Sequence, residues 1–585
     1  MMSDGGYLKG GRVIRHFGGK IGILINIVFA VLFLYFGCWC ALKSRPGDFA
    51  NYYTSSRLAL EGRLDKVNMY DYYDFQQNVN KYFRGTLASF IPFPPSTILL
   101  MVPLAWLSPE TARTGVILIN VLGVLALIWI LRRYTCLPLA VVASLTFLSS
   151  LSLWSNLREG QVYILMTLLI AAALLSESKG KHVTAGILLG LILPVKYFTA
   201  LFVLYFLLKK NLRLVAGALG AAAFVFAAGF VLTGPRMNEF YFGAILPQHL
   251  AGHIQDPFAI NFQSFNSLLN RLFVYNETLN PDPIIHAAFL GYWLKSFVPL
   301  IGLILLILAI NATKAFGKAF HDAYWISLLT LFGLTIAPAS ATYHLVMLIL
   351  PIVLLVSLGR AEIEPDGADF LGRRLPTLIT FYILINVLPF YKLYVLRNDP
   401  ALQLIAYSRL FMLTLFFLAA LPPAIFKGRL FPTLSAGAIA LSLVIGFVRS
   451  PHQVNADGAK WAALPGLIIR RLSYHGGSLY YLRDTPTGYI EMRNGHPSES
   501  LMTDPRQTTK NGVLTAFDST VDNTYQVFLR SNINGRISEV AKEGSHNMDP
   551  VWSSDDSRLY FLSDRDRGFD CTTIYYIPVG ELPKP

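Results

Sequence analysis

Charged side chains are scarce in this sequence. Of its 585 residues only 14% are charged, whereas 54% are hydrophobic, and the mean hydropathy is +0.48. A soluble globular protein carries roughly 25% charged residues. The chain therefore has too little polar surface for a water-exposed body of its size. The composition argues against an ordinary soluble enzyme and predicts a polytopic α-helical membrane protein.

Cysteine is also scarce, and several cofactor motifs are missing. The four cysteines show no metal-like spacing and no disulfide framework: Cys38, Cys40, Cys136 and Cys571. We find no Walker loop, dinucleotide fingerprint or nucleophile elbow. His249 and His253 are four residues apart and could share a helix face as metal ligands. Their loop offers no third ligand, so we expect neither a metal nor a cofactor.

The net charge of +14 does not indicate nucleic-acid binding. Much of the excess lies in short basic clusters between apolar runs, at Lys179–Lys181, Lys209–Arg213 and Arg373–Arg374. Such clusters mark cytoplasmic loops. The basic N-terminus leads into 21–42, which is too long for a signal-peptide core, so we expect a retained anchor with a cytoplasmic N-terminus.

Apolar runs long enough to span a bilayer recur along the chain. The clear candidates are 21–42, 113–132, 137–154, 160–177, 212–233, 288–311, 323–338, 341–358, 375–395, 406–426 and 432–449. The run 184–208 is interrupted by Pro194 and Lys196, which indicates a broken helix or a hairpin. The run 93–107 is short and begins with Pro94-Pro95, so it could be re-entrant. The count is about thirteen spans, with an uncertainty of about two.

The basic loops also predict which segments face outward. We expect the protein to lie in the plasma (inner) membrane of the cell envelope. These are 43–92, 155–161, 234–287, 339–343, 396–405 and the tail 450–585. Two of the outward loops are long, and long loops in compact domains are usually functional.

The sequence divides into a membrane domain, 1–449, and a small β-rich extracytoplasmic domain, 450–585. Period-two strand patterns appear in the tail at Ser478–Leu482, Gln526–Arg530 and Arg558–Leu562. The segment Asp549–Arg565 resembles one strand–turn–strand unit of the TolB-type β-propellers. About 135 residues are too few for a full propeller of at least four blades. We expect a binding or packing role for this domain.

Asp48 is the strongest candidate for chemistry. It follows the first span in Gly47-Asp48-Phe49-Ala50-Asn51-Tyr52-Tyr53, with aromatic residues around it. A partly desolvated carboxylate has a raised pKa and can act as a general base. The alternative is a solvated carboxylate at the membrane surface.

Ordered motifs around Asp48 resemble glycosyltransferase family 87, of the GT-C class. The landmarks are Asp48-Phe49, Tyr52-Tyr53, Glu61-Gly62, Met69-Tyr70-Asp71, Pro94-Pro95, Gly160-Gln161-Val162, Ala185-Gly186 with Gly190, Lys196, Gln263-Ser264 and, after Pro338, Tyr343-His344. They cover roughly residues 45–350, and the tail carries no such signal.

The resemblance implies a hexose donor linked to polyprenyl phosphate, typically mannose, and a glycan or glycolipid acceptor in contact with the bilayer. It implies that Asp48 is the base, that the sugar is transferred with inversion, and that His344 lies near the donor phosphate. Since the phosphate leaving group carries its own charge, a nearby cation can stabilise it without a divalent metal.

Four further residues are candidates, and two of them, Lys196 and Arg158, have an alternative role. Lys196 could bind phosphate as an intramembrane cation, or it could snorkel to the interface. Arg158 and Gln161 could bind phosphate or sugar hydroxyls, although Arg158 could simply pair with Glu159. The resemblance also includes Gln263 in the second long loop.

Tyr52 and Tyr53 suit sugar stacking and equally suit an aromatic belt at the membrane interface. Two other functions remain open for the whole chain. One is a transporter or flippase for a lipid-linked glycan, and the other is a non-catalytic assembly protein that binds through its β domain.

Overall fold

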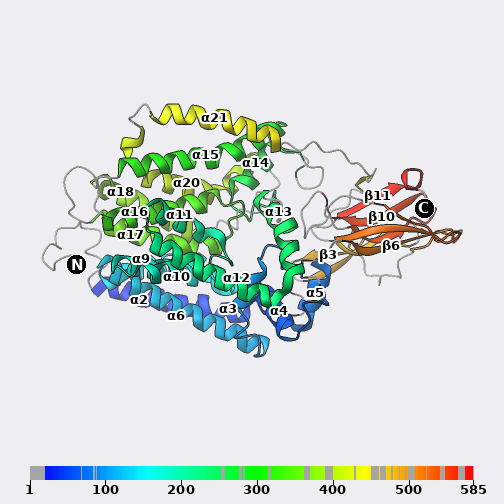
Figure 1. Ribbon diagram of the computed structural model, residues 1–585, viewed down its shortest axis with the longest axis horizontal. Helices are drawn as coiled ribbons and strands as arrows, with labels where there is room; N and C mark the ends of the chain where they lie inside the picture. Colours follow the sequence, from blue (N-terminus) through cyan, green and yellow to red (C-terminus); the bar gives the residue numbers. More distant parts are fainter. Residues whose placement is uncertain are drawn as a thin grey trace.

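The computed structural model describes residues 20–583 with interruptions. The gaps are 68, 71, 84–85, 87, 252–256, 276–279, 281–282, 314–317, 361–368, 389–399, 427–429, 450–459, 462–468, 476–477, 486–487, 495, 498–506, 522–523, 541–546, 564 and 566–572. The basic N-terminus and His253 therefore lie outside the described residues. Figure 1 shows a large body of helices and, beyond one end of it, a smaller group of strands.

Four helices among the described residues are long and apolar enough to cross a membrane. They are Asn26–Lys43, Pro109–Thr135 (α6), Leu212–Gly243 and Ala288–Ala312 (α15). The first of these runs through α2 (Lys20–Leu32), the π-helix η1 (Phe33–Trp39) and α3 (Cys40–Lys43). The third consists of α12 (Leu212–Phe240) and the start of the π-helix η4 (Tyr241–Ile245). The chain is thus a helical membrane protein with a small β region, as the sequence predicts.

Most of the other predicted spans are shorter or broken helices. Their bounds are α9 Tyr163–Ser178, α16 Lys318–Ile336, η5 Thr342–Leu348 with α17 Ile349–Leu358, α18 Asp369–Val387, α19 Pro400–Ala406, α20 Ser408–Ala420, η7 Pro423–Phe426 and α21 Leu430–Arg449. By length and composition, the described residues give four spans, or five if a bent pair counts as one. Long helices alone therefore do not reach the count of about thirteen.

The bent pair replaces the single span predicted at 137–154. It consists of α7 (Leu139–Phe147) and α8 (Ser150–Glu159), which meet at 64°. The break has a polar cause, because the Ser149 and Ser152 hydroxyls donate to Oδ1 of Asn386 at 3.2 and 2.7 Å. The apolar run predicted at 137–154 is therefore bent, and hydropathy does not register the buried polar contact at the bend.

The interrupted run 184–208 is a broken helix, as predicted. It forms α10 (His182–Gly190), the short η3 (Tyr197–Thr199) and α11 (Ala200–Leu208), with Pro194 and Lys196 in the break. A Cβ atom at Gly186 or Gly190 would collide with the backbone of α12 at Leu214 or Ala218. Small residues at these two positions therefore allow the close packing of α10 on α12.

The two long loops that the sequence predicts to face outward contain helices that the sequence did not predict. The first forms α4 (Phe49–Leu60) and α5 (Tyr72–Tyr82), and the run 93–107 contains only the short η2 (Pro95–Leu100). The second contains α13 (Leu246–Ala251) and α14 (Phe265–Phe273). Buried aromatic residues of the first loop form their own core with Phe90, Phe93 and Tyr241. The first loop is therefore a folded cap on the membrane body.

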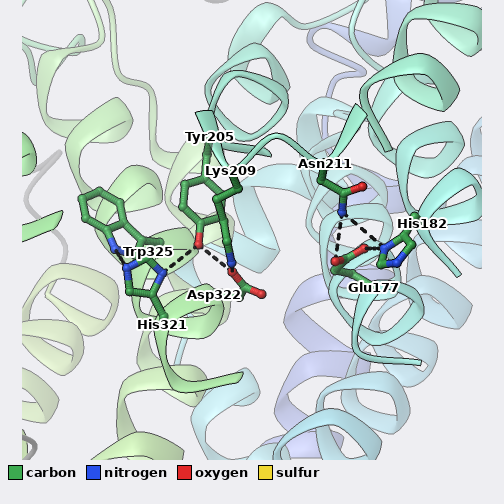
Figure 2. A network of polar contacts seen from close by, with 8 residues as sticks. All are labelled: Glu177, His182, Tyr205, Lys209, Asn211, His321, Asp322 and Trp325. Carbon is green, nitrogen blue, oxygen red and sulfur yellow. Dashed lines mark hydrogen bonds and ion pairs between the residues drawn. The ribbon is translucent and has the colours of Figure 1, made fainter. Parts of the chain in front are cut away.

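A buried polar network joins α11 to α16 near the C-terminal end of α9 (Figure 2). The Tyr205 hydroxyl donates to Oδ1 of Asp322 at 2.6 Å, and Lys209 forms an ion pair with the same carboxylate. The indole of Trp325 donates to Nε2 of His321 at 3.1 Å. A neutral His321 therefore carries its proton on Nδ1, which faces the Tyr205 hydroxyl at 3.2 Å.

A second polar group lies beside it in Figure 2, where α9, α10 and α12 meet. His182 contacts Oε2 of Glu177 at 2.6 Å, and the Asn211 amide donates to Oε1 of Glu177 at 3.1 Å. Gln161 immediately precedes the start of α9, whereas Glu177 lies near its end. The two polar groups of Figure 2 are therefore at the opposite end of α9 from Gln161.

We expect Lys209→Met to lower the free energy of unfolding by roughly 2 kcal/mol. This figure lies between the values typical of exposed and of fully buried pairs, since the Lys209 side chain is 26% exposed and Asp322 only 7%. Thermal unfolding of the protein in detergent micelles measures the effect, and Lys210→Met changes an exposed neighbour as the control. Equal midpoints for the two variants would contradict a stabilising ion pair.

The C-terminal strands form three antiparallel sheets. Their bounds are β1 Lys460–Trp461, β2 Ile469–His475, β3 Ser478–Thr485, β4 Gly488–Arg493, β5 His496–Pro497, β6 Leu514–Val521, β7 Thr524–Ser531, β8 Ile537–Glu539, β9 Asn547–Trp552, β10 Arg558–Ser563 and β11 Thr573–Pro578. The orders are β2-β3-β4-β5, β6-β7-β8 and β1-β11-β10-β9, so the first strand completes the last sheet.

The three strand patterns read from the sequence fall within β3, β7 and β10 and are confirmed. The segment Asp549–Arg565 contains the β9–β10 hairpin, but its likeness to a TolB-type unit gains no support. The domain boundary at 449/450 stays a prediction. In Figure 1 the sheets lie beyond the end of the helical body that carries α4, α5 and α13.

Candidate active site

Asp48 is held at the start of α4 by side chains from two segments. The Gln161 amide donates to Oδ2 of Asp48 at 2.7 Å, and the Asn51 amide donates to Oδ1 at 3.1 Å. The side-chain oxygen Oε1 of Gln161 accepts from the Tyr52 hydroxyl at 2.8 Å, which fixes the orientation of the Gln161 side-chain amide. Both carboxylate oxygens therefore act as acceptors, as they do in the ionised form.

Two glycines let the Asp48 segment approach the end of α8. Gly47 and Gly160 have φ angles of +50° and +68°, a region that favours glycine. A Cβ atom at Gly47 would collide with Oε2 of Glu159, and one at Gly160 would lie 2.6 Å from Cβ of Phe49. The Glu159 carboxylate also accepts a hydrogen bond from the backbone amide of Asp48. These contacts place Asp48 against Gln161.

The environment of Asp48 suits a general base. Burial of the carboxyl group raises the pKa of Asp48 above its usual value. Hydrogen bonds from Gln161, Tyr343 and Asn51 and the charge of Lys196 act in the opposite direction, because they favour the ionised form. Asp48 as a whole residue is half-buried.

Lys196 packs against two aromatic rings beside the segment that carries Asp48. Its ammonium group is 4.9 Å from the ring centre of Phe93 and 5.4 Å from that of Tyr163. Such cation–π contacts stabilise an ammonium group that is partly removed from water. The charge of Lys196 also favours the ionised form of the Asp48 carboxyl group.

His344 joins the cluster through Tyr163. Its ring lies edge-on to Tyr163, with ring centres 4.5 Å apart, and Nδ1 accepts from the Ala341 backbone amide at 2.8 Å. A neutral His344 therefore carries its proton on Nε2 and can donate from that atom. Tyr343 stacks on the same Tyr163 ring at 5.5 Å. Tyr163 is thus the common neighbour of Lys196, Tyr343 and His344.

Three predicted site residues do not join this cluster. Tyr53 donates to the Leu107 carbonyl at 2.8 Å, and its ring is enclosed by Tyr82 and Phe83. Arg158 pairs with Glu159 at 3.5 Å and lies over Trp154, which is the simpler of its two predicted roles. Gln263 donates to the carbonyls of Ile260 and Ala406 at 2.8 and 3.0 Å.

Tyr52 is placed beside Asp48, but in a supporting role. Its side chain is fully buried and packs on Phe93 with ring centres 5.0 Å apart. A buried ring cannot belong to an aromatic belt facing the bilayer interface, so that alternative is wrong for Tyr52. The contact of its hydroxyl with Gln161 instead stabilises the amide that holds Asp48.

The second outward loop approaches the same cation. His249 lies on α13, and burial together with the charge of Lys196 lowers the pKa of His249. Within the part of the chain that the structure describes, no three His, Cys, Asp or Glu side chains are grouped as metal ligands would be.

Asp48, Gln161 and Tyr343 come from three segments predicted to face outward, and the structure brings them together.

Sequence reasoning missed Asn51, Tyr163 and Tyr343 as parts of this cluster. Asn51 follows Asp48 by three residues, a spacing at which side chains on a helix meet, so a helix prediction at 49–60 would have found it. Tyr163 and Tyr343 adjoin landmark residues, but they resemble ordinary aromatic residues at helix ends. Only the fold shows that Tyr163 and Tyr343 lie in one cluster with Asp48 and Lys196.

We expect Gln161→Leu to move the acid limb of the pH–rate profile to higher pH. The Gln161 amide favours the ionised form of Asp48, so its removal raises the pKa of Asp48 further. A base must be ionised to act, so activity is lost as the pH falls through this pKa. Initial rates between pH 5 and 9 measure the shift, and Gln77→Leu, an exposed change on α5, is the control. An unshifted acid limb would show that Gln161 does not tune the base.

Comparisons with known proteins give a consistent class. Residues 90–338 match the model of glycosyltransferase family 87. The resemblance read from the sequence is confirmed. The family that this segment matches consists of glycosyltransferases, which is the enzyme class that the sequence predicts. Gln161, Lys196 and Gln263 lie within the matched segment, whereas Asp48 precedes it and His344 follows it.

One relative is a polyprenol-phosphate-mannose-dependent alpha-(1-2)-phosphatidylinositol mannoside mannosyltransferase of Mycobacterium tuberculosis. It is 26% identical over 286 residues, which are 46% of this chain and 61% of the relative. The alignment therefore spans less than two thirds of that relative.

Two solved structures show a more distant likeness. They are ArnT from Cupriavidus metallidurans bound to undecaprenyl phosphate and the same protein in the apo state. The identities are 15% and 14% and the TM-scores are 0.34 and 0.33. The alignments cover 74% and 71% of this chain and 77% of each ArnT chain. A likeness of this degree transfers no feature to this chain.

Proposed function

We propose that this protein is a membrane glycosyltransferase that moves a hexose from a polyprenyl-phosphate donor to an acceptor hydroxyl outside the cytoplasm. Mannose is the sugar we expect, by analogy with the Mycobacterium tuberculosis relative. The observation that carries the proposal is the partly buried Asp48 carboxylate, held by two amides beside the charge of Lys196. This pair combines a base with a cation that can face a phosphate.

The proposed reaction is a single displacement. The acceptor oxygen attacks the anomeric carbon while Asp48 takes the hydroxyl proton. The bond between this carbon and the phosphate oxygen breaks, and its electron pair leaves with polyprenyl phosphate. Attack from the opposite face inverts the anomeric centre, so a β-linked donor gives an α-linked product.

The positive charge of Lys196 gives this residue a role in the proposed reaction. The donor is a phosphodiester with one negative charge, and the leaving group becomes a phosphomonoester that gains a second. A cation beside the phosphate therefore interacts more strongly with the transition state than with the bound donor, which lowers the barrier. His344 can add a hydrogen bond from Nε2 to the same phosphate.

The test uses the full-length protein in liposomes. Polyprenyl-phosphate mannose labelled in the sugar is the donor, and a lipid and glycan extract of the source membrane supplies the acceptor. We expect label to enter the acceptor fraction in step with release of polyprenyl phosphate, and nucleotide-linked mannose to be inert. Transfer from the nucleotide sugar alone would overturn the proposal.

The same experiment separates the enzyme from a transporter. A flippase for a lipid-linked glycan would move the intact labelled donor across the bilayer without cleaving it. A quenched-fluorescence or lectin-accessibility assay on the same liposomes detects such movement. Movement without cleavage would favour the transporter, whose best support in this chain is the broken helix around Pro194 and Lys196.

A further inference from the structure

The segment Ser340–His344 brings two side chains to the proposed site. Tyr343 makes a side-chain hydrogen bond with Asp48, and His344 lies against Tyr163. The helix η5 begins only at Thr342, and Ala341 before it is extended, with φ −80° and ψ 164°. Contacts within the segment order it locally, and contacts from elsewhere in the chain set how it enters the site.

Arg409 provides one such contact. It lies on α20, its side chain is 4% exposed, and Nη1 donates to the Thr342 hydroxyl at 2.8 Å. A guanidinium group stays charged in proteins, so the bond is charge-assisted and stronger than a neutral one. Thr342 immediately precedes Tyr343, so this bond fixes the residue next to the one that contacts Asp48.

A second attachment leads to the same region of the chain. The backbone amide of Gln263 donates to the Ser340 carbonyl at 3.2 Å, and its side chain donates to the Ala406 carbonyl at 3.0 Å. The segment is thus held at Ser340 by Gln263 and at Thr342 by Arg409. Because Gln263 also bonds to Ala406, both contacts lead to residues 406–409. This part of the chain lies outside the segment 90–338 that matches the family model.

We infer that Arg409 is a positioning residue for sugar transfer, acting through Thr342 on the segment that presents Tyr343 to Asp48 and His344 to the donor. The inference rests on the proposed function. Arg409 itself touches neither substrate nor the reacting atoms in this account. Its bond to Thr342 sets the position of the two side chains that do.

The first test is a double-mutant cycle on the full-length protein with the polyprenyl-phosphate mannose assay. Arg409→Gln and Thr342→Val each remove one partner of the bond. We expect each to lower kcat about 10-fold to 30-fold with little change in KM, since misplacing reactive groups slows the chemical step. The double variant should be no slower than Arg409→Gln alone, because both changes remove the same contact.

The pH profile distinguishes positioning from general stabilisation. If Tyr343 is released from Asp48, the carboxylate loses a hydrogen bond that favours its ionised form, so the acid limb moves to higher pH. Arg409→Lys keeps the charge and should restore part of kcat. Arg374→Gln is the matched control, since Arg374 donates to the carbonyls of Ala419 and Leu421 at the other end of α20.

A measurement that does not depend on sugar transfer completes the test. The His344 backbone amide donates to the Ala341 carbonyl at 3.1 Å. Its hydrogen–deuterium exchange should accelerate in Arg409→Gln and stay unchanged in Arg374→Gln. Faster exchange in a protein that transfers no mannose would refute the proposed function and leave the anchoring intact. Wild-type exchange, multiplicative kinetic effects or an unshifted pH profile would overturn the inference about Arg409.

Discussion

Asp48→Asn should reduce kcat about 1,000-fold while leaving the membrane body folded. General-base catalysis contributes roughly 10²–10⁴-fold in enzymes. Asparagine keeps the size of the side chain but cannot take a proton from the acceptor. Both carboxylate oxygens of Asp48 accept from amides, at Gln161 and Asn51, so the new NH2 group must also face a donor. Loss of the negative charge further removes the partner of Lys196.

The experiment needs a control that changes charge in the same outward loop without touching the site. Asp65→Asn serves, because Asp65 is exposed on the connection between α4 and α5. Equal yields of monodisperse protein and equal thermal midpoints for the two variants establish folding. If Asp48→Asn keeps more than a tenth of the wild-type kcat, Asp48 is not the base, and another group must accept the proton.

Lys196→Met should lower kcat about 100-fold and weaken donor binding much less. Methionine retains an apolar stem that packs over Phe93 and Tyr163 but lacks the ammonium charge. Removing one preorganised donor at a developing negative charge costs roughly 10²–10³-fold in kcat. Since the phosphate gains charge as it leaves, the loss falls mainly on kcat and only slightly on KM.

Initial rates over a range of donor concentrations separate the two parameters. Lys179→Met, an exposed change at the end of α9, is the control and should match the wild type. An unchanged kcat with a large rise in KM would instead mean that Lys196 binds the ground-state phosphate alone. An unchanged kcat/KM would remove Lys196 from the site and favour its alternative role as a snorkelling residue.

The sequence predicted the membrane class and several helices closely, because long apolar runs are a strong signal. The run 113–132 lies within α6, and 288–311 almost coincides with α15. The helices of the outward loops were missed for a physical reason. α4 and α5 are stabilised by an aromatic core that includes Phe90 and Tyr241. Tyr241 is far from both helices in the sequence. Hydropathy windows do not detect such a core.

The site was predicted in part. Asp48, Gln161, Lys196 and His344 were each named, and the structure places them in one cluster. That Gln161 bonds to Asp48 could not be predicted, since 113 positions separate the two residues. Arg409 had a usable signal, because a cation inside the predicted span 406–426 is costly and usually has a specific partner. The sequence could not show that this partner is Thr342.

The dispersion of the site along the chain has a consequence for biogenesis. The segment that carries His344 leaves the ribosome about 300 residues after Asp48. At roughly 5–20 residues per second, the interval is about 15–60 s. During that time the cap formed by α4 and α5 can fold, but the Asp48 carboxylate has no Tyr343. The proposed site therefore stays incomplete until insertion of the later helices.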